Sequence, residues 1–346
     1  METVPDIDWD AREKKLQEII KFGKEKNVSG YDCIIGVSGG KDSTRQALYV
    51  REKLGLKPLL VCCTYPPEQL SERGAHNLGN LISLGFDTIS VSPGPQTWKK
   101  MMRLGFLRFG NWARSTEMAL YASAPRIAIA YHIPLIFLGE NPAIQLGDLD
   151  VGSFSWEANR MKEGNTIKGG PQVLYNKKDK ISPQDLIMYE YPSDDEMDWA
   201  KLKIVYLGYF WKDFTRIDNA RVSISHGLEI RDDVAENQWS FHLFEALDEE
   251  FMVVNQYMKY LKYGFGRVTD VVNEEVRLGH MERSKAVELA KKLDGKCPPK
   301  YLKDFCKYIG ITLDEFNKVA ESYRNKDIWG KNKLGHWRLK EDIGKT

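Results

Sequence analysis

The sequence is poor in cysteine and has neither a long apolar run nor an excess of charge of one sign. Its 346 residues include five cysteines, without a CxxC pair or the spacing of a metal site. None of the apolar runs approaches the ~20 residues of a membrane-spanning helix, and the acidic N-terminus carries no apolar signal segment. The 50 Lys and Arg balance 49 Asp and Glu, whereas a protein that binds a nucleic acid backbone usually has a positive excess. We therefore expect a protein of the reducing cytoplasm that neither spans a membrane nor binds nucleic acid.

Short apolar runs alternate with helical patterns in the first half of the chain. Strands are predicted at residues 33–37, 58–65, 88–92 and 133–141, and a helix at 10–25 precedes them. Nearly continuous apolar strands separated by helices are typical of a parallel sheet covered on both faces. The pattern predicts an α/β fold with a doubly wound, mostly parallel sheet, whose ligands bind at the carboxyl ends of the strands.

The rest of the chain has a different character. Residues 145–235 are rich in Gly, Asp and aromatic residues, and we expect long loops there with one strand at 203–211. From about residue 241 the apolar spacing becomes helical, and Thr312 with Glu315 forms a capping box that starts a last helix. We therefore predict three parts, namely a helical segment (1–30), an α/β domain (31–235) and a helical C-terminal region (236–346).

The sequence SGGKDST follows the first predicted strand and begins a helix. At such a junction several backbone N–H groups lie unpaired at the positive end of the helix dipole, and glycines let the backbone approach an anion closely. The ligand that such a turn is expected to bind is a phosphate or pyrophosphate. A carboxylate repels phosphate unless a divalent cation lies between them, so Asp42 suggests a bound Mg²⁺. The candidate residues are Ser38, Gly39, Gly40, Lys41, Asp42, Ser43 and Thr44, with Lys41 and Asp42 in catalytic roles.

This loop lacks the spacing of a Walker A motif, and SGGKDS instead resembles the PP-loop of the ATP pyrophosphatases. The resemblance covers about residues 31–145. It implies a PP-loop (HUP-like) fold and an enzyme that splits ATP, with Mg²⁺, between the α and β phosphates. In this family the end of the second strand lies near the adenine, and a glycine at a later strand end lies near the ribose and α-phosphate. The further ATP-binding residues that it implies are Cys63, Thr64, Gly139, Glu140 and Asn141.

Several longer stretches resemble the N-acetyl sugar amidotransferases, bacterial enzymes that make acetamidino sugars for surface polysaccharides, O-antigens and flagellar glycans. These stretches are FGNW (109–112), LGENPA (138–143), RVSISHGLEIRDD (221–233) and the segment from YGFGRVTD to KKLDG (263–295). The likeness runs from about Asp8 to Trp329. Relatives usually begin with a cysteine-rich segment of CxxC type, and this sequence starts at the helix that follows it.

The resemblance implies an adenylating reaction. The N-acetyl carbonyl oxygen of a nucleotide-activated sugar attacks the α-phosphate of ATP, and ammonia then replaces AMP to give an acetamidine. The sequence contains no motif of a glutaminase, so ammonia comes from solution or from a separate subunit. The resemblance implies separate glutaminase and ammonia-channel subunits akin to the pair used in histidine biosynthesis, and it leaves room for a homodimer.

Two charged stretches are candidates for binding the sugar nucleotide. Arg267, Asp270, Glu274 and Arg277 follow a three-four spacing that places them on one helical face, where arginines suit carboxylate or phosphate. The rival interpretation is a solvated stripe of ion pairs. His226 and Arg231 lie in the second stretch, for which a structural network is the rival interpretation.

Two other functions compete with the amidotransferase. A PP-loop enzyme that modifies tRNA by thiolation or lysidine formation is the first, although thiolation normally needs a pair of catalytic cysteines. Cys62 and Cys63 lie in a predicted strand, where buried thiols are the better interpretation. A non-catalytic nucleotide-binding protein is the second, and the intact SGGKDS motif argues against it.

Overall fold

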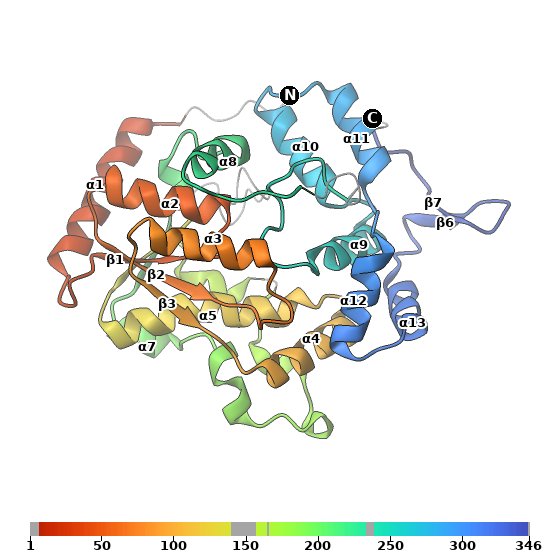
Figure 1. Cartoon of the computed structure of the whole chain (residues 1–346), viewed down its shortest axis with the longest axis horizontal. Helices are drawn as coiled ribbons and strands as arrows, with labels where there is room; N and C mark the ends of the chain where they lie inside the picture. The colour runs from red at the N-terminus through yellow and green to blue at the C-terminus, as the bar shows by residue number, and fades with distance from the viewer. Residues whose placement is uncertain (1–6, 140–156, 165, 233–238, 345–346) are drawn as a thin grey trace.

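A five-stranded parallel sheet forms the centre of the protein (Figure 1). The computed structural model describes residues 7–139, 157–164, 166–232 and 239–344. All neighbouring strands pair in parallel in the order β3-β2-β1-β4-β5, which confirms the predicted α/β class. The strands are β1 (Cys33–Gly36), β2 (Pro58–Cys63), β3 (Thr88–Val91), β4 (Leu135–Leu138) and β5 (Lys203–Tyr206).

Helices cover both faces of this sheet because alternate strand residues point to opposite sides. Ile35 and Leu60 face one layer of helices, which consists of α1 (Trp9–Glu25), α2 (Lys41–Glu52) and α3 (Glu72–Ser83). Ile34 and Val61 face the other layer, formed by α5 (Ala113–Tyr131) and α7 (Asp194–Trp199). Helix α1 buries Leu16 in the same cluster as β1, so the predicted N-terminal segment shares the core of the α/β domain.

Three segments differ from the sequence-based expectation. Strand β5 ends at Tyr206 rather than continuing to residue 211, and a short 3-10 helix, η5 (Leu207–Phe210), follows it. Trp211 stacks on Tyr49 of α2 with ring centroids 3.8 Å apart, which requires the chain to turn over that helix. Helix α4 (Pro95–Phe109) was not predicted. The described part of the predicted loop region also contains helices α7 and α8 (Arg216–Ser225) and four further 3-10 helices, namely η1 (Asn159–Glu163), η2 (Pro171–Leu174), η3 (Lys177–Asp179) and η4 (Pro183–Tyr189).

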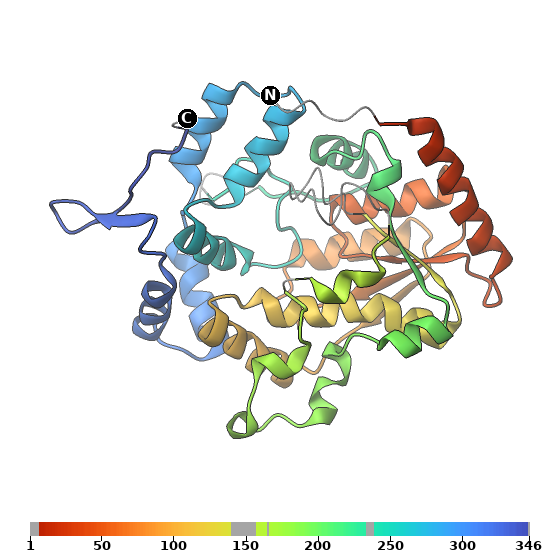
Figure 2. The same ribbon diagram turned by 180° about the vertical axis from the view of Figure 1, so that it is seen from behind.

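The C-terminal third is helical, as the spacing predicts, and it packs beside the end of the sheet (Figures 1 and 2). Phe305 and Phe316 from this third contact Phe106 of α4, with a stacked pair at 4.9 Å between Phe106 and Phe316. The capping box of Thr312 and Glu315 is confirmed. The helices are α9 (Met252–Tyr263), α10 (Arg267–Arg277), α11 (Arg283–Leu293), α12 (Pro299–Ile309) and α13 (Leu313–Tyr323), followed by a hairpin of β6 (Trp329–Lys331) and β7 (Trp337–Leu339).

The segment before α9 is not helical, although its apolar spacing predicts a helix from about residue 241. The carboxylate of Glu249 accepts hydrogen bonds from the backbone N–H groups of Phe251 and Met252, at 2.6 Å each, and so fixes the start of α9. Residues 239–250 therefore run as an irregular segment across the carboxyl end of the sheet. In the described part of the chain no helix is both long enough and apolar enough to cross a lipid bilayer.

Candidate functional site

A cavity of about 310 Å³ lies at the carboxyl ends of the central strands. Its floor comes from the ends of β1, β2 and β4 and from the first turn of α2, and one side comes from α5. Residues 244–248 and Arg267 from the C-terminal third complete the lining. Strands β2 and β4 flank β1 on opposite sides, so the connections that leave β1 and β4 diverge there. This is the switch point at which open α/β sheets bind ligands.

The first turn of α2 presents unpaired N–H groups to this cavity. Its N-cap, Gly40, has no side chain with which to cap the helix. Within the described residues, the backbone N–H groups of Lys41, Asp42 and Ser43 have no acceptor, whereas that of Thr44 already bonds to the carbonyl of Gly40. Three free donors at the positive end of a 12-residue helix form a ready anion site.

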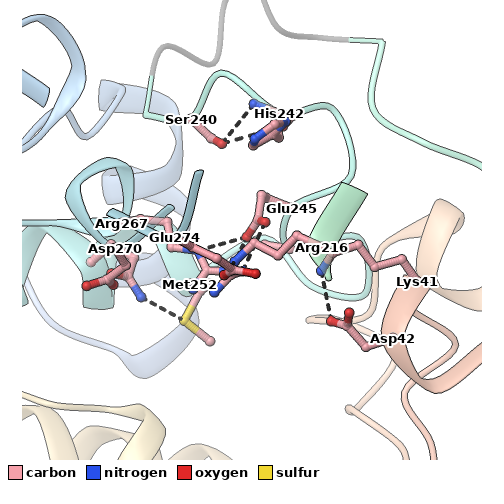
Figure 3. A network of polar contacts seen from close by, with 12 residues as sticks. Lys41, Asp42, Arg216, Ser240, His242, Glu245, Met252, Arg267, Asp270 and Glu274 are labelled. Carbon is pink, nitrogen blue, oxygen red and sulfur yellow. Dashed lines mark hydrogen bonds and ion pairs between the residues drawn. The ribbon is translucent and has the colours of Figure 1, made fainter. Parts of the chain in front are cut away.

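Lys41 and Asp42 are held in a defined arrangement beside these donors. Lys41 Nζ lies 2.8 Å from Asp42 Oδ2, and Asn219 Nδ2 of α8 donates to Asp42 Oδ1 over 2.6 Å (Figure 3 shows the first pair). Burial opposes ionisation of Asp42, but Lys41, Asn219 and Arg216 together lower its pKa below the ordinary value. The Asp42 side chain keeps 40% of its surface exposed, so this carboxylate is both ionised and accessible from the cavity.

A buried ion-pair network connects the cavity to the C-terminal helices (Figure 3). Glu245 Oε2 accepts a hydrogen bond from Arg267 Nε over 2.8 Å, and its Oε1 lies 3.4 Å from Arg216 Nη1. Arg216 also pairs with Glu274. Burial opposes the ionisation of Glu245, yet Arg267, Lys41 and Arg216 hold its pKa well below the usual range. Glu245 therefore fixes the guanidinium of Arg267 at the wall of the cavity.

The structure separates the loop residues predicted from the sequence into two groups. Gly39, Thr44 and Thr64 do not line the cavity. Gly39 has φ +84°, and a Cβ at this position would lie 2.9 Å from the backbone nitrogen of Leu78 on α3, so this glycine serves the packing of α2 against α3. Thr44 is buried and the hydroxyl of Thr64 pairs with Ser92. Those that do line the cavity are Ser38, Gly40, Lys41, Asp42, Ser43, Cys63 and Gly139. Glu140 and Asn141 lie outside the described residues.

Of the predicted sugar-site residues, Arg267 lines the cavity and the others do not. Asp270 pairs with Lys259. Arg231 is buried, where it binds the carboxylate of Glu250 and the carbonyl oxygen of Ala246. His226 Nδ1 lies 2.8 Å from the carbonyl oxygen of Val222 at the end of α8, and Arg277 lies exposed at the end of α10. Asp270 and Arg231 thus have the structural ion-pair contacts that the rival interpretation describes.

Sequence reasoning missed other residues of this cavity. Gln46 lines it and follows Asp42 by four positions, a spacing that puts both side chains on one face of α2 and could have identified it. Glu245 and Asp248 line it as well, and Asn219 supports it from α8. They lie about 170 residues or more beyond the loop, and only the fold brings them there.

The cysteine pair at the end of β2 does not have the character of catalytic thiols. Cys62 and Cys63 are both buried. Burial raises the pKa of Cys62 to about 12 and that of Cys63 to about 11. Because the thiolate is the reactive form of cysteine, these values leave both thiols inert at neutral pH.

One comparison with known proteins bears on this site. Residues 238–343 match the family model described as LPS biosynthesis protein WbpG-like, C-terminal domain. The search of curated proteins found no match. The matched stretch contains residues 244–248 and Arg267, which line the cavity, and it indicates a role in lipopolysaccharide biosynthesis.

Proposed function

We propose that this protein is an ATP-dependent amidotransferase that converts the N-acetyl group of a nucleotide-activated sugar into an acetamidine. The observation that carries the proposal is the composition of one cavity. It combines the unpaired N–H donors of the SGGKDS turn with Arg267 from a stretch that matches a lipopolysaccharide biosynthesis family. A phosphate-binding turn and a sugar-biosynthesis region that share one cavity are suited to transferring AMP to a sugar derivative.

The reaction has two steps, adenylation of the N-acetyl group and replacement of AMP by ammonia. The carbonyl oxygen of the N-acetyl group attacks the α-phosphate of ATP, the bond to the β-phosphate breaks, and pyrophosphate leaves with the electron pair. Ammonia then adds to the activated carbon and loses a proton, and AMP leaves with the electron pair of the C–O bond. Adenylation serves both steps, because it makes the carbon more electrophilic and turns its oxygen into a good leaving group. Such phosphoryl chemistry depends chiefly on positioning and on stabilisation of charge.

The residues of the cavity have separate roles in this scheme. The N–H groups of the α2 turn and the ammonium of Lys41 bind the phosphates and offset the charge that develops on pyrophosphate. In the described residues no group of three or more His, Cys, Asp or Glu side chains forms a metal site. Mg²⁺ usually takes only one or two carboxylates together with phosphate oxygens, so Asp42 fits as its single protein ligand. Bound there, Mg²⁺ would neutralise phosphate charge.

Asp248 is the carboxylate available for the second step. It lines the cavity, where Lys41 acts on it electrostatically. Its backbone is fixed, because its carbonyl oxygen accepts from Ser71 N over 3.1 Å. Burial raises the pKa of Asp248 above the ordinary value, although its interaction with Lys41 opposes this. A more basic carboxylate is suited to accept the proton that ammonia loses.

Activity assays with Asp42→Asn test the proposal directly. The wild-type protein, given ATP, Mg²⁺, ammonium and a series of nucleotide-activated N-acetyl sugars, is expected to form AMP and a product about one mass unit lighter, because =NH replaces =O. Asp42→Asn keeps an oxygen that can accept from Asn219, so the variant should fold while AMP formation is lost. If the wild type binds ATP but forms AMP with none of these sugars, the protein is not this enzyme. If AMP forms with tRNA instead, it is a tRNA-modifying enzyme.

A further inference from the structure

Gln46 is a buried side chain whose amide nitrogen has no hydrogen-bond partner among the residues that the structure describes. It lies on α2, one turn after Asp42, and is only 1% exposed. Its Nε2 is buried and has no hydrogen-bond acceptor in the described part of the chain. An unsatisfied buried amide destabilises a protein, so such groups are rare unless a ligand completes them.

The surroundings of Gln46 direct its amide to the cavity. The residue lines the cavity together with Asp42 and Gly139. A Cβ placed on Gly139 would lie 3.0 Å from Gln46 Oε1 and 3.2 Å from a ring carbon of Phe214. The amide therefore lies against the bare backbone at the end of β4, with an aromatic ring beside it. A side chain at position 139 would occupy the space that the amide and a ligand share.

We propose that the amide of Gln46 binds the ribose hydroxyls of ATP. The inference rests on the proposed function only in that ATP is the nucleotide. The N–H donors of the α2 turn select the phosphates, and Gln46 lies about 6 Å further along the same helix. The part of ATP next to its phosphates is the ribose.

The chemistry of the amide favours a hydroxyl over a phosphate oxygen at this position. A carboxamide offers a donor and an acceptor side by side, and a hydroxyl can satisfy either or both. A phosphate oxygen only accepts, so it cannot pair with Oε1. Both hydroxyls of a ribose lie next to one another, which suits a bidentate contact with a single amide.

A ligand-binding role for Gln46 predicts that its substitution affects stability and ATP affinity in opposite directions, which a purely structural role does not. Gln46→Leu removes the unsatisfied amide with little change in volume, so the free protein becomes more stable, with a rise in Tm of about 2–4 °C. The same substitution removes the contact with the ligand, so ATP binds about 10-fold more weakly. Stability and affinity are thus expected to change in opposite directions.

Gln69→Leu provides the matched control. Gln69 is equally buried, but its Nε2 donates to Glu249 and its Oε1 accepts from Trp98, and it does not line the cavity. Its replacement breaks two satisfied hydrogen bonds, so Tm should fall while the affinity for ATP is unchanged. If Gln46→Leu lowers the Tm because the leucine packs poorly, Gln46→Met, which also removes the amide, takes its place.

The test is calorimetric binding of ATP, 2′-deoxy-ATP and 3′-deoxy-ATP to the full-length wild type, Gln46→Leu and Gln69→Leu, without sugar or ammonium. The expected result is that Gln46→Leu weakens ATP about 10-fold but has a smaller effect on at least one deoxy analogue. Equal losses for all three nucleotides, or no loss for ATP, overturn the proposal. If the wild type binds no ATP, both proposals fail. If Gln46→Leu behaves as expected but bound ATP never yields AMP with a sugar, the proposed function alone fails.

Discussion

Asn219 donates a hydrogen bond from its Nδ2 to Oδ1 of Asp42 over 2.6 Å and thereby joins α8 to the first turn of α2. The Oδ1 of the same asparagine accepts from Arg45 Nη1 over 2.9 Å. Asn219 is fully buried, so its amide connects these two charged groups from inside the protein. The orientation of the loop carboxylate therefore depends on a residue 177 positions away.

Asn219→Ala should destabilise the protein by about 1–3 kcal/mol, because it leaves a hydrogen-bonding position of Arg45 and one of Asp42 unpaired. Urea unfolding at pH 7 measures this change. Ser225→Ala is the control on the same helix, since the Ser225 hydroxyl is exposed and bonds only locally. That variant should stay within ~0.5 kcal/mol of the wild type. A similar loss in both variants would show that the Asn219 network contributes nothing specific.

If Arg267 binds the sugar nucleotide as proposed, Arg267→Ala should raise the KM for the sugar nucleotide about 10-fold and leave the KM for ATP within about 2-fold, since a charge-assisted contact would be lost. Steady-state kinetics with each substrate varied in turn measure the two constants. Arg277→Ala tests the same helix outside the cavity and should change neither constant. If the sequence-based assignment of Arg277 to the sugar site is right, the Arg277→Ala variant should also show a higher KM for the sugar nucleotide. Equal changes in both constants for Arg267→Ala would indicate a structural role.

His242→Phe should remove part of the acid sensitivity of the fold. Burial, with help from Arg216, Lys41 and Arg267, lowers the pKa of His242 to about 4, and its Nε2 has no partner. In the unfolded chain a histidine takes up a proton near pH 6.5. The unfolded state therefore binds more protons between about pH 6.5 and 4, and the stability present above this window is lost as the pH falls through it.

The substituted phenylalanine can keep the ring contacts of His242 with Phe241 and Phe244. Between pH 7.5 and pH 4.5 the variant should lose about 2 kcal/mol less unfolding free energy than the wild type. Chemical unfolding at the two pH values measures the difference. His336→Phe, at an exposed histidine, should retain the pH dependence of the wild type. If His242→Phe has the same pH dependence of the unfolding free energy as the wild type, His242 is not the source of the acid sensitivity.

Asp248→Asn should separate the two steps of the proposed reaction. Sugar-dependent exchange of labelled pyrophosphate into ATP reports the first step and should persist without ammonia. Acetamidine formation with ammonium should fall about 100-fold, as expected for loss of a general base. Hydroxylamine is a weaker base than ammonia, so its adduct gives up the proton more readily and product formation with it should fall less. If exchange and amidine formation fall together, Asp248 acts in ATP binding instead.

Local sequence patterns were enough to predict the class of the fold and the helix start after β1, where unpaired N–H groups lie. Apolar runs such as Cys33–Gly36 and Pro58–Cys63 are buried on both faces, and local composition identifies them without tertiary information. The turn after β1 can likewise be identified from neighbouring residues alone, because a helix N-terminus exposes its own N–H groups. The helical character of the C-terminal third followed from its apolar spacing in the same way.

Tertiary structure alone decided which residues share the cavity with that turn. Glu249 stops the helical pattern of residues 244–251, although the apolar spacing there is helical, by capping α9 at Phe251 and Met252. The charged pattern of α10 was equally ambiguous from the sequence. In the structure Asp270 pairs with Lys259 and Glu274 pairs with Arg216, whereas Arg267 lines the cavity. Ion pairs and caps of this kind join residues far apart in the chain, so their outcome depends on which partners the packed core brings within reach.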